Sequence, residues 1–121
     1  MKHQRIVLAS RPAAEAAVDN FRLEAAETPP LAEGQVLVRN HWLSLDPYMR
    51  MRMNDVKSYA PPVAVGAVMV GGTAGEVVES RHPDFRAGDK VVAQGGWQEA
   101  VVLDATQKGL MRKVDTAHVP L

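Results

Sequence analysis

The apolar residues of this chain fall in short blocks, and most blocks have the length and β-branched content of strands. In the clearest block, 36–43, Val36 and Val38 occupy alternate positions, as in a strand with one buried face. About seven short strands are predicted in this way. They cover residues 4–10, 21–25, 36–43, 63–80 with an interruption at 71–72, 90–93, 97–103 and 110–114.

Two blocks carry more detailed predictions. Phe21, Leu23 and Ala25 alternate with polar residues, which predicts a half-buried strand with these three side chains inward. Residues 63–70 are apolar on both faces, which predicts a strand buried on both sides. Residues 12–18 are expected to form a loop with a helical tendency, because the alanine-rich stretch is too short to be a stable helix alone.

Two pairs of glycines interrupt the β pattern. Gly71 and Gly72 predict a bulge, or a close approach by another backbone or a ligand. Gly95 and Gly96 mark a second break, flanked by Gln94 and Trp97. Short strands separated by such turns indicate a mainly β protein, a small barrel or sandwich formed as a single domain.

The stretch from Leu43 to Arg50 follows the clearest strand and changes character at a proline. Asp46 is suited to cap a helix N-terminus, and Pro47 fits the first helical position. Tyr48, Met49 and Arg50 would then project from a short helical turn, combining a hydrogen-bond donor, an apolar thioether and an anion-binding fork. A capped surface turn without function is the alternative interpretation.

Composition excludes several classes of function. Fourteen basic and fourteen acidic residues cancel, so no nucleic acid or anionic membrane is expected as a partner. There is no cysteine, and the four histidines are scattered, so neither disulfides nor a metal site is expected. The apolar residues 62–75 are too few to span a bilayer, and no signal peptide is recognised, so a cytoplasmic protein is expected.

The motif Ser44-Leu-Asp-Pro-Tyr-Met-Arg50 resembles the signature of the zinc-independent, NADP-dependent medium-chain reductases. This group includes the prostaglandin reductases, curcumin reductases, leukotriene hydroxydehydrogenases and plant double-bond reductases. Three further stretches, 8–23, 33–39 and 85–91, are similar to the group in the same order. The resemblance covers essentially all of the chain and implies a GroES-like, partly closed β-barrel over residues 1–121, without the NADP-binding Rossmann domain.

The resemblance also implies an activity: hydride transfer from NADPH to the C=C bond of an α,β-unsaturated ketone or aldehyde, without metal. Tyr48 is the catalytic candidate, and Pro47, Tyr48 and Arg50 are candidates for cofactor binding. Tyr48, Met49, Gln94 and Trp97 are candidates for substrate binding. For Met49 and Trp97 simple packing is the alternative, and for Arg50 a salt bridge to a nearby carboxylate.

Two other classes of function stay open. The chain could be a stand-alone GroES-like binding module, or a structural domain without catalysis. For the chain by itself we expect little or no turnover, because the hydride donor has no pocket of its own. We also expect self-association, as a homodimer, through surfaces that a second domain would otherwise cover.

Overall fold

The computed structural model describes residues 1–46, 48–54, 62–107 and 110–114, and most of this part is β structure. The strands are β1 Lys2–Leu8, β2 Phe21–Glu27, β3 Gln35–Leu43, β4 Thr73–Ser80, β5 Lys90–Ala93, β6 Ala100–Asp104 and β7 Met111–Lys113. A short 3-10 helix, η1 (Val18–Asn20), precedes β2, and an α-helical turn, α1 (Tyr48–Met51), follows β3. The helical turn predicted for Tyr48, Met49 and Arg50, within the signature, is therefore confirmed.

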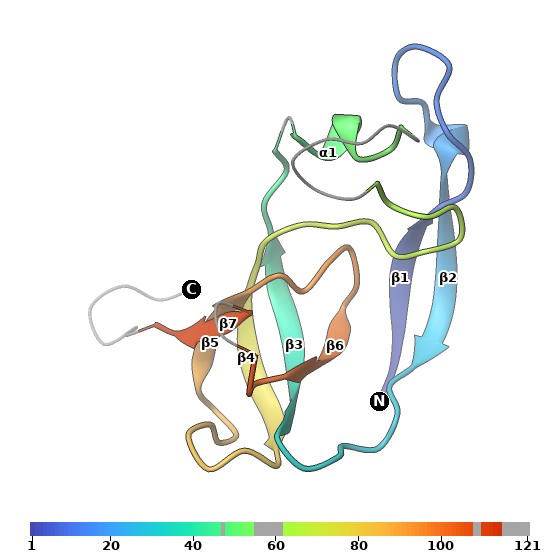
Figure 1. Cartoon of the computed structure of the whole chain (residues 1–121). Helices are drawn as coiled ribbons and strands as arrows, with labels where there is room; N and C mark the ends of the chain where they lie inside the picture. Colours follow the sequence, from blue (N-terminus) through green and yellow to red (C-terminus); the bar gives the residue numbers. More distant parts are fainter. Residues whose placement is uncertain (47, 55–61, 108–109, 115–121) are drawn as a thin grey trace.

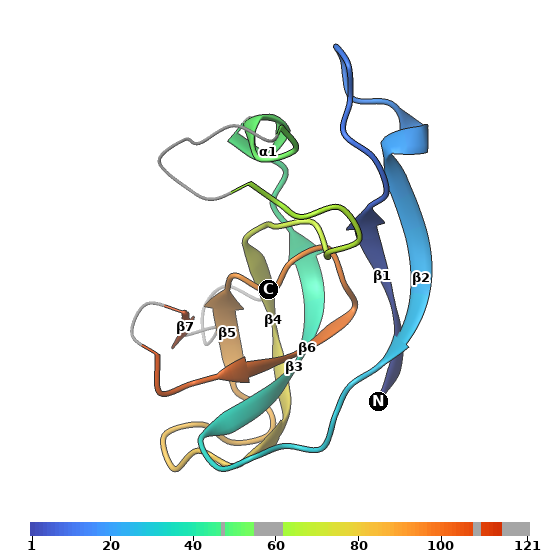
Figure 2. The ribbon, with the colours of Figure 1, turned by 45° about the vertical axis from the view of Figure 1, so that its right-hand side comes forward.

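The strands form a β1–β2 hairpin and a five-stranded antiparallel sheet in the order β6-β3-β4-β5-β7. Figures 1 and 2 show the hairpin standing beside the larger sheet, with α1 near the end where β3 finishes. The two sheets are joined through the backbone of Ile6, whose N–H donates to Trp97 O at 2.8 Å and whose carbonyl accepts from Met69 N–H at 3.0 Å. These bonds curl the molecule into a partly closed barrel, which confirms the predicted fold class.

The core lies around β3, the strand that pairs with both β4 and β6. Val36 and Val38 face one cluster of buried side chains, as their alternation predicts. Leu37, on the opposite face, is also buried, where it packs with Leu31 and Ala100. Both faces of β3 are thus covered at Val36–Val38, whereas the end of the strand that leads into the signature, His41 to Leu43, is exposed.

The predicted inward face of β2 is confirmed at Phe21, which packs on Trp97, but is wrong at Leu23 and Ala25. Leu23 has 62% of its surface exposed, whereas Glu24 on the opposite face is half-buried. Nothing packs over the Leu23 part of the β2 face among the described residues, whereas the Glu24 carboxylate binds Arg22 at 2.7 Å and Arg5 of β1 at 3.3 Å. Alternation identified the strand, but the paired arginines place the carboxylate against the hairpin.

The predicted strand over residues 63–70 is also wrong. Within it, Val68 forms an isolated bridge with Val7, and Val65 is 55% exposed. Gly66 has a φ of +91°, a conformation that favours glycine and turns the chain there. The segment is an apolar loop across the end of β1, where Leu8 N–H donates to Ala67 O at 2.9 Å.

The strand predicted over residues 97–103 begins later, as β6 at Ala100. The preceding residues bond to β1 instead, since Glu99 N–H donates to Gln4 O at 3.0 Å. Within the described residues, no helix is long and apolar enough to cross a membrane.

Candidate functional site

Three segments meet at one end of the larger sheet: the end of β3, the double glycine before β4, and the double glycine after β5. Ser44 N–H donates to Gly72 O at 2.9 Å, and Gly96 N–H donates to Gly71 O at 3.1 Å. These bonds hold the signature against both glycine breaks. The predicted site residues are therefore carried by segments that are fixed to one another.

Gly71 is the point of closest approach. A Cβ at this position would lie 2.8 Å from Leu43 Cδ1, 3.0 Å from Met49 Cε and 3.2 Å from Trp97 Nε1. The double glycine predicted a bulge or a close approach by a backbone or a ligand, whereas the atoms nearest to this position belong to side chains. This close approach brings together Met49 and Trp97, two of the predicted substrate residues.

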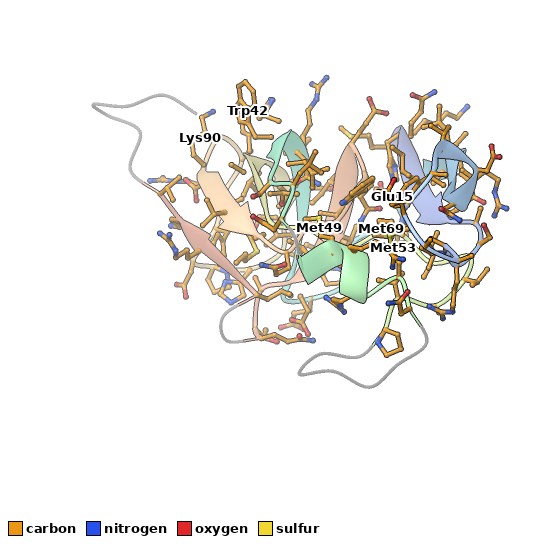
Figure 3. The ribbon with its side chains drawn as sticks, turned by 90° about the horizontal axis from the view of Figure 1, so that it is seen from above. Glu15, Trp42, Met49, Met53, Met69 and Lys90 are labelled. Atoms are coloured by element: carbon orange, nitrogen blue, oxygen red, sulfur yellow. The ribbon has the colours of Figure 1, made fainter. Side chains whose placement is uncertain are left out.

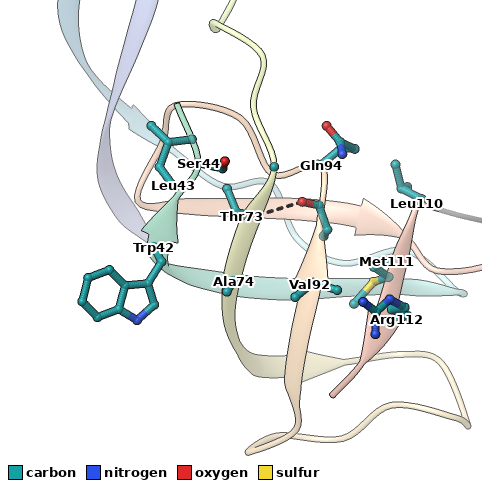
Figure 4. A pocket seen from close by; sticks show the side chains of 12 residues that line it. Trp42, Leu43, Ser44, Thr73, Ala74, Val92, Gln94, Leu110, Met111 and Arg112 are labelled. Carbon is teal, nitrogen blue, oxygen red and sulfur yellow. Dashed lines mark hydrogen bonds between the residues drawn. The ribbon is translucent and has the colours of Figure 1, made fainter. Parts of the chain in front are cut away.

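On one side of Gly71 lies a hollow of about 550 Å³, which we call the sheet-end hollow (Figure 4). It contains Gln94, a predicted substrate residue whose side chain is exposed. Its walls are mostly apolar, with Arg112 as a charged side chain at the rim. The lining residues are Trp42, Leu43, Ser44, Gly72, Thr73, Ala74, Val92, Ala93, Gln94, Leu110, Met111 and Arg112.

The Thr73 hydroxyl lies in this hollow, but its proton is already donated to a backbone carbonyl. It donates to Ala93 O at 3.2 Å and accepts from Gly95 N–H at 3.1 Å. A Cβ on Gly95 would lie only 2.4 Å from the same hydroxyl oxygen. The second glycine break therefore has a structural cause, and Thr73 serves to fix it.

On the other side of Gly71 lies an apolar slot of about 350 Å³, which we call the methionine slot. It contains Met49, Arg50 and Trp97, so the structure separates these predicted residues from Gln94. The lining residues are Ala16, Phe21, Leu45, Asp46, Met49, Arg50, Met53, Met69 and Trp97.

Trp97 combines packing with an unusual polar feature. Its ring stacks on Phe21, with centroids 5.4 Å apart and planes inclined by 19°. Its Nε1 is buried and has no hydrogen-bond partner among the described residues. Packing, the alternative interpretation from the sequence, is therefore present, and the substrate role stays a prediction.

The guanidinium of Arg50 is engaged by uncharged groups. It donates to Asn54 Oδ1 at 2.8 Å and to the carbonyl oxygen of Ala14. These bonds tie α1 to the loop between β1 and η1, residues 9–17. No carboxylate partner for Arg50 is seen among the described residues, and its cofactor role stays a prediction.

The centre of the signature is described in its backbone only. Pro47 lies outside the described residues, as does the side chain of Tyr48, whose backbone begins α1. Asp46 O accepts from Met49 N–H at 3.1 Å, while the Asp46 carboxylate accepts from the Ser44 hydroxyl at 2.9 Å. The roles predicted for Pro47 and Tyr48 stay predictions.

The carboxylates with perturbed pKa values lie away from the sheet-end hollow. A hydrogen bond from Lys90, at 2.8 Å, lowers the pKa of Glu76, with a smaller contribution from His41. Hydrogen bonds also lower the pKa values of Glu24, Asp89 and Asp104.

No group of three His, Cys, Asp or Glu side chains in the described ranges is placed to hold a metal ion. The hollow thus suits an uncharged, partly apolar ligand, not acid–base chemistry by its own described walls.

Two residues whose hydrogen bonds fix segments near the site were not identified from the sequence. Arg11 donates to Met53 O at 2.9 Å, and Asn40 Nδ2 donates to Gln98 O at 2.9 Å, beside the second glycine break. Both contacts join residues more than 40 positions apart, so no local pattern could indicate them. Thr73 could have been found, since it directly follows the double glycine.

A family model described as the N-terminal domain of oxidoreductase matches residues 4–112. The chain belongs to this family. Among curated proteins, this oxidoreductase N-terminal domain is 55% identical over 98 residues to the NADPH-dependent curcumin reductase of Escherichia coli, covering 81% of the chain and 28% of that protein. It is 38% identical over 93 residues to the NADP(+)-dependent 2-alkenal reductase of Nicotiana tabacum, covering 76% of the chain and 26% of that protein.

Comparison with solved structures supports the same family. The oxidoreductase domain superposes on CurA from Vibrio vulnificus with a TM-score of 0.86 and 45% identity, covering 96% of the chain and 34% of CurA. For CurA in complex with NADPH the TM-score is 0.83, again at 45% identity, with 91% of the chain and 32% of CurA covered. The family resemblance recognised in the sequence is confirmed. The domain spans about a third of the length of these proteins.

Proposed function

We propose that this domain forms the substrate side of an NADPH-dependent reductase acting on the C=C bond of α,β-unsaturated ketones and aldehydes. The observation that carries the proposal is the 55% identity to a protein named as an NADPH-dependent curcumin reductase. The likeness to a 2-alkenal reductase supports a conjugated carbonyl compound as the substrate class. The geometry agrees, since the sheet-end hollow offers apolar walls and few charges.

The sheet-end hollow fits the nicotinamide end of such a cofactor. Its volume of about 550 Å³ exceeds that of one aromatic ring, and Leu43, Val92 and Leu110 give it apolar walls. The Ser44 hydroxyl is a polar group suited to a carboxamide. When bound, NADPH would supply the hydride. Pro47 and Tyr48 are proposed to hold this end, and Arg50 is proposed to reach a ribose or phosphate of the cofactor. The rest of the cofactor is proposed to lie against the part of the relatives that this chain does not span.

The chain's own chemical contribution is proposed to be a hydrogen bond from Tyr48. Reduction at the β-carbon leaves an enolate on the substrate, and a phenol directed at its oxygen stabilises the developing charge. In a dry site one such donor contributes roughly 3 kcal/mol to transition-state stabilisation. Metal independence is part of the proposal. Met49, Gln94 and Trp97 are proposed to position the substrate.

The test is a chimera in which residues 1–121 replace the matched N-terminal part of the Escherichia coli reductase. We expect NADPH oxidation with 4-phenylbut-3-en-2-one and a saturated ketone as product. Tyr48→Phe should lower kcat about 100-fold, because one charge-stabilising donor is lost. The 121-residue chain alone should give no turnover. A folded chimera that oxidises no NADPH would contradict the proposed function.

Self-association is proposed for the chain alone. Trp42 and Leu45, close to the end of β3, are 62% and 71% exposed, which favours burial against another protein surface. Sedimentation equilibrium of the 121-residue chain should give a dimer mass. A monomer at all concentrations would refute this.

A further inference from the structure

The methionine slot is formed by flexible apolar side chains under α1. Met49, Met53 and Met69 are each at most 5% exposed, and Figure 3 shows them gathered beside α1. The stacked rings of Phe21 and Trp97 complete the inner wall. Methionine is unbranched and polarisable, so a wall of three can adapt to apolar ligands of different shape.

Two arginine bonds join the loop between β1 and η1 to the α1 segment beside the slot. Arg11 of the β1–η1 loop donates to Met53 O at 2.9 Å, and Arg50 donates in the opposite direction to the Ala14 carbonyl oxygen. The loop is thereby fixed beside α1, with Ala16 at the slot's exposed rim. The charged lining groups are already partnered, since Arg50 binds Asn54 and Asp46 binds Ser44. What the slot offers is therefore mostly apolar surface, with Asp46 and Arg50 as its charged lining residues.

The slot adjoins the candidate site across Gly71. Its wall residues Met49 and Trp97 both reach the Cβ position of Gly71, at 3.0 and 3.2 Å. The next residue, Gly72, lines the sheet-end hollow. Met49 also directly follows Tyr48 in the chain. A substrate whose carbonyl lies near Tyr48 would thus have the slot within reach of its hydrocarbon end.

We propose that the methionine slot is the subsite for the apolar tail of the substrate, an unbranched alkyl chain or an aryl group attached to the enone. The proposal rests on the proposed function for the identity of the substrate, but the slot's affinity for such tails does not require turnover. Each methylene buried in an apolar site strengthens binding about fourfold. The slot should therefore select for tail length.

Binding can be measured on the 121-residue chain with [methyl-¹³C]methionine labelling. The probes are butan-2-one, hexan-2-one, octan-2-one and decan-2-one, which are saturated and cannot be reduced at a C=C bond. We expect the methyl signals of Met49, Met53 and Met69 to shift, and those of Met1 and Met111 to stay. The Kd should fall about fourfold per methylene until the slot is full. Shifts centred on Met111, or a Kd independent of chain length, would overturn the proposal.

Ala16→Phe fills the slot from its exposed rim, and Ala13→Phe is the matched control on the same loop. Ala16 lines the slot whereas Ala13 does not, and both are exposed, so neither change disturbs the core. Ala16→Phe should raise the Kd of octan-2-one at least tenfold and that of butan-2-one less than twofold. Ala13→Phe should change neither. Leu45→Trp, at another exposed part of the rim, should repeat the effect. Equal Kd values for octan-2-one in all variants would refute the subsite.

The chimera separates this proposal from the proposed function. With 2-alkenals of increasing length, kcat/KM should rise with length in the parent chimera and stay flat with Ala16→Phe. Turnover that ignores tail length in the parent would refute the slot and leave the reductase in place. Length-dependent ketone binding without any turnover would support the slot and refute the reductase.

Discussion

Gly75→Ala should strongly destabilise the fold by forcing β3 and β4 apart. Gly75 lies in β4 opposite Asn40 of β3. A Cβ on Gly75 would lie 2.2 Å from Arg39 O and 3.0 Å from Arg39 C and Asn40 Cα. All three are backbone atoms, so no side-chain rotation can relieve the contact.

The expected magnitude follows from the rigidity of that neighbour. Added methyl groups in packed regions typically cost about 1–3 kcal/mol, and a backbone contact places this change at about 3 kcal/mol. Gly72→Ala is the matched control, because its new Cβ would meet Gln94 Nε2 at 3.8 Å, an ordinary contact. That change should be neutral, or stabilising by about 0.5 kcal/mol through the unfolded state.

Urea unfolding followed by tryptophan fluorescence measures both variants. With a slope of about 1.5 kcal/mol/M, Gly75→Ala should lower the unfolding midpoint by about 2 M at an unchanged slope. Gly72→Ala should keep the midpoint within about 0.4 M of the parent. Equal midpoints for the two variants would show that the β3–β4 contact at Gly75 is not as close as described, and the reasoning would fail.

Two further predictions concern stability. Asn20→Ala should lower the free energy of unfolding by about 1–3 kcal/mol, because the buried amide accepts from Ala17 N–H at 2.8 Å and donates to Ser10 Oγ at 3.1 Å; urea unfolding measures the loss, and an unchanged midpoint would contradict it. The lowered pKa of Glu76, held down by Lys90, stabilises the fold fully above the ordinary value of 4.5, and this contribution is lost as pH falls through the lowered value. Glu76→Gln should make the acid loss of stability shallower in unfolding curves from pH 6 to pH 3, and identical slopes would refute that role.

The strands could be predicted where alternation and burial agree. Val36 and Val38 lie in the core as their spacing indicates. The strand prediction for residues 63–70 failed because an apolar run can form either a strand or a loop that lies over a strand. In this chain Gly66, with a φ of +91°, turns the backbone into a loop. The prediction for Leu23 failed because nothing packs over that part of the β2 face among the described residues, whereas Phe21 on the same face packs on Trp97.

The sequence indicated which segments form the site, but not which of their side chains lie together. The signature and the glycine breaks do meet, as the family resemblance implies. Gln94 lies in the sheet-end hollow, whereas Met49 and Trp97 lie in the methionine slot beyond Gly71. That division depends on packing across the fold. The arginine bonds beside the slot likewise join distant residues, which a single sequence cannot reveal.

The most direct test of the central claim is the fate of the transferred hydride. The chimera is supplied with NADPH deuterated at the reactive position of the nicotinamide and with 4-phenylbut-3-en-2-one in ordinary water. We expect a saturated ketone with one deuterium on the β-carbon and none on the α-carbon. Deuterium on a carbinol carbon, as carbonyl reduction would give, would contradict the assignment of this domain to a double-bond reductase.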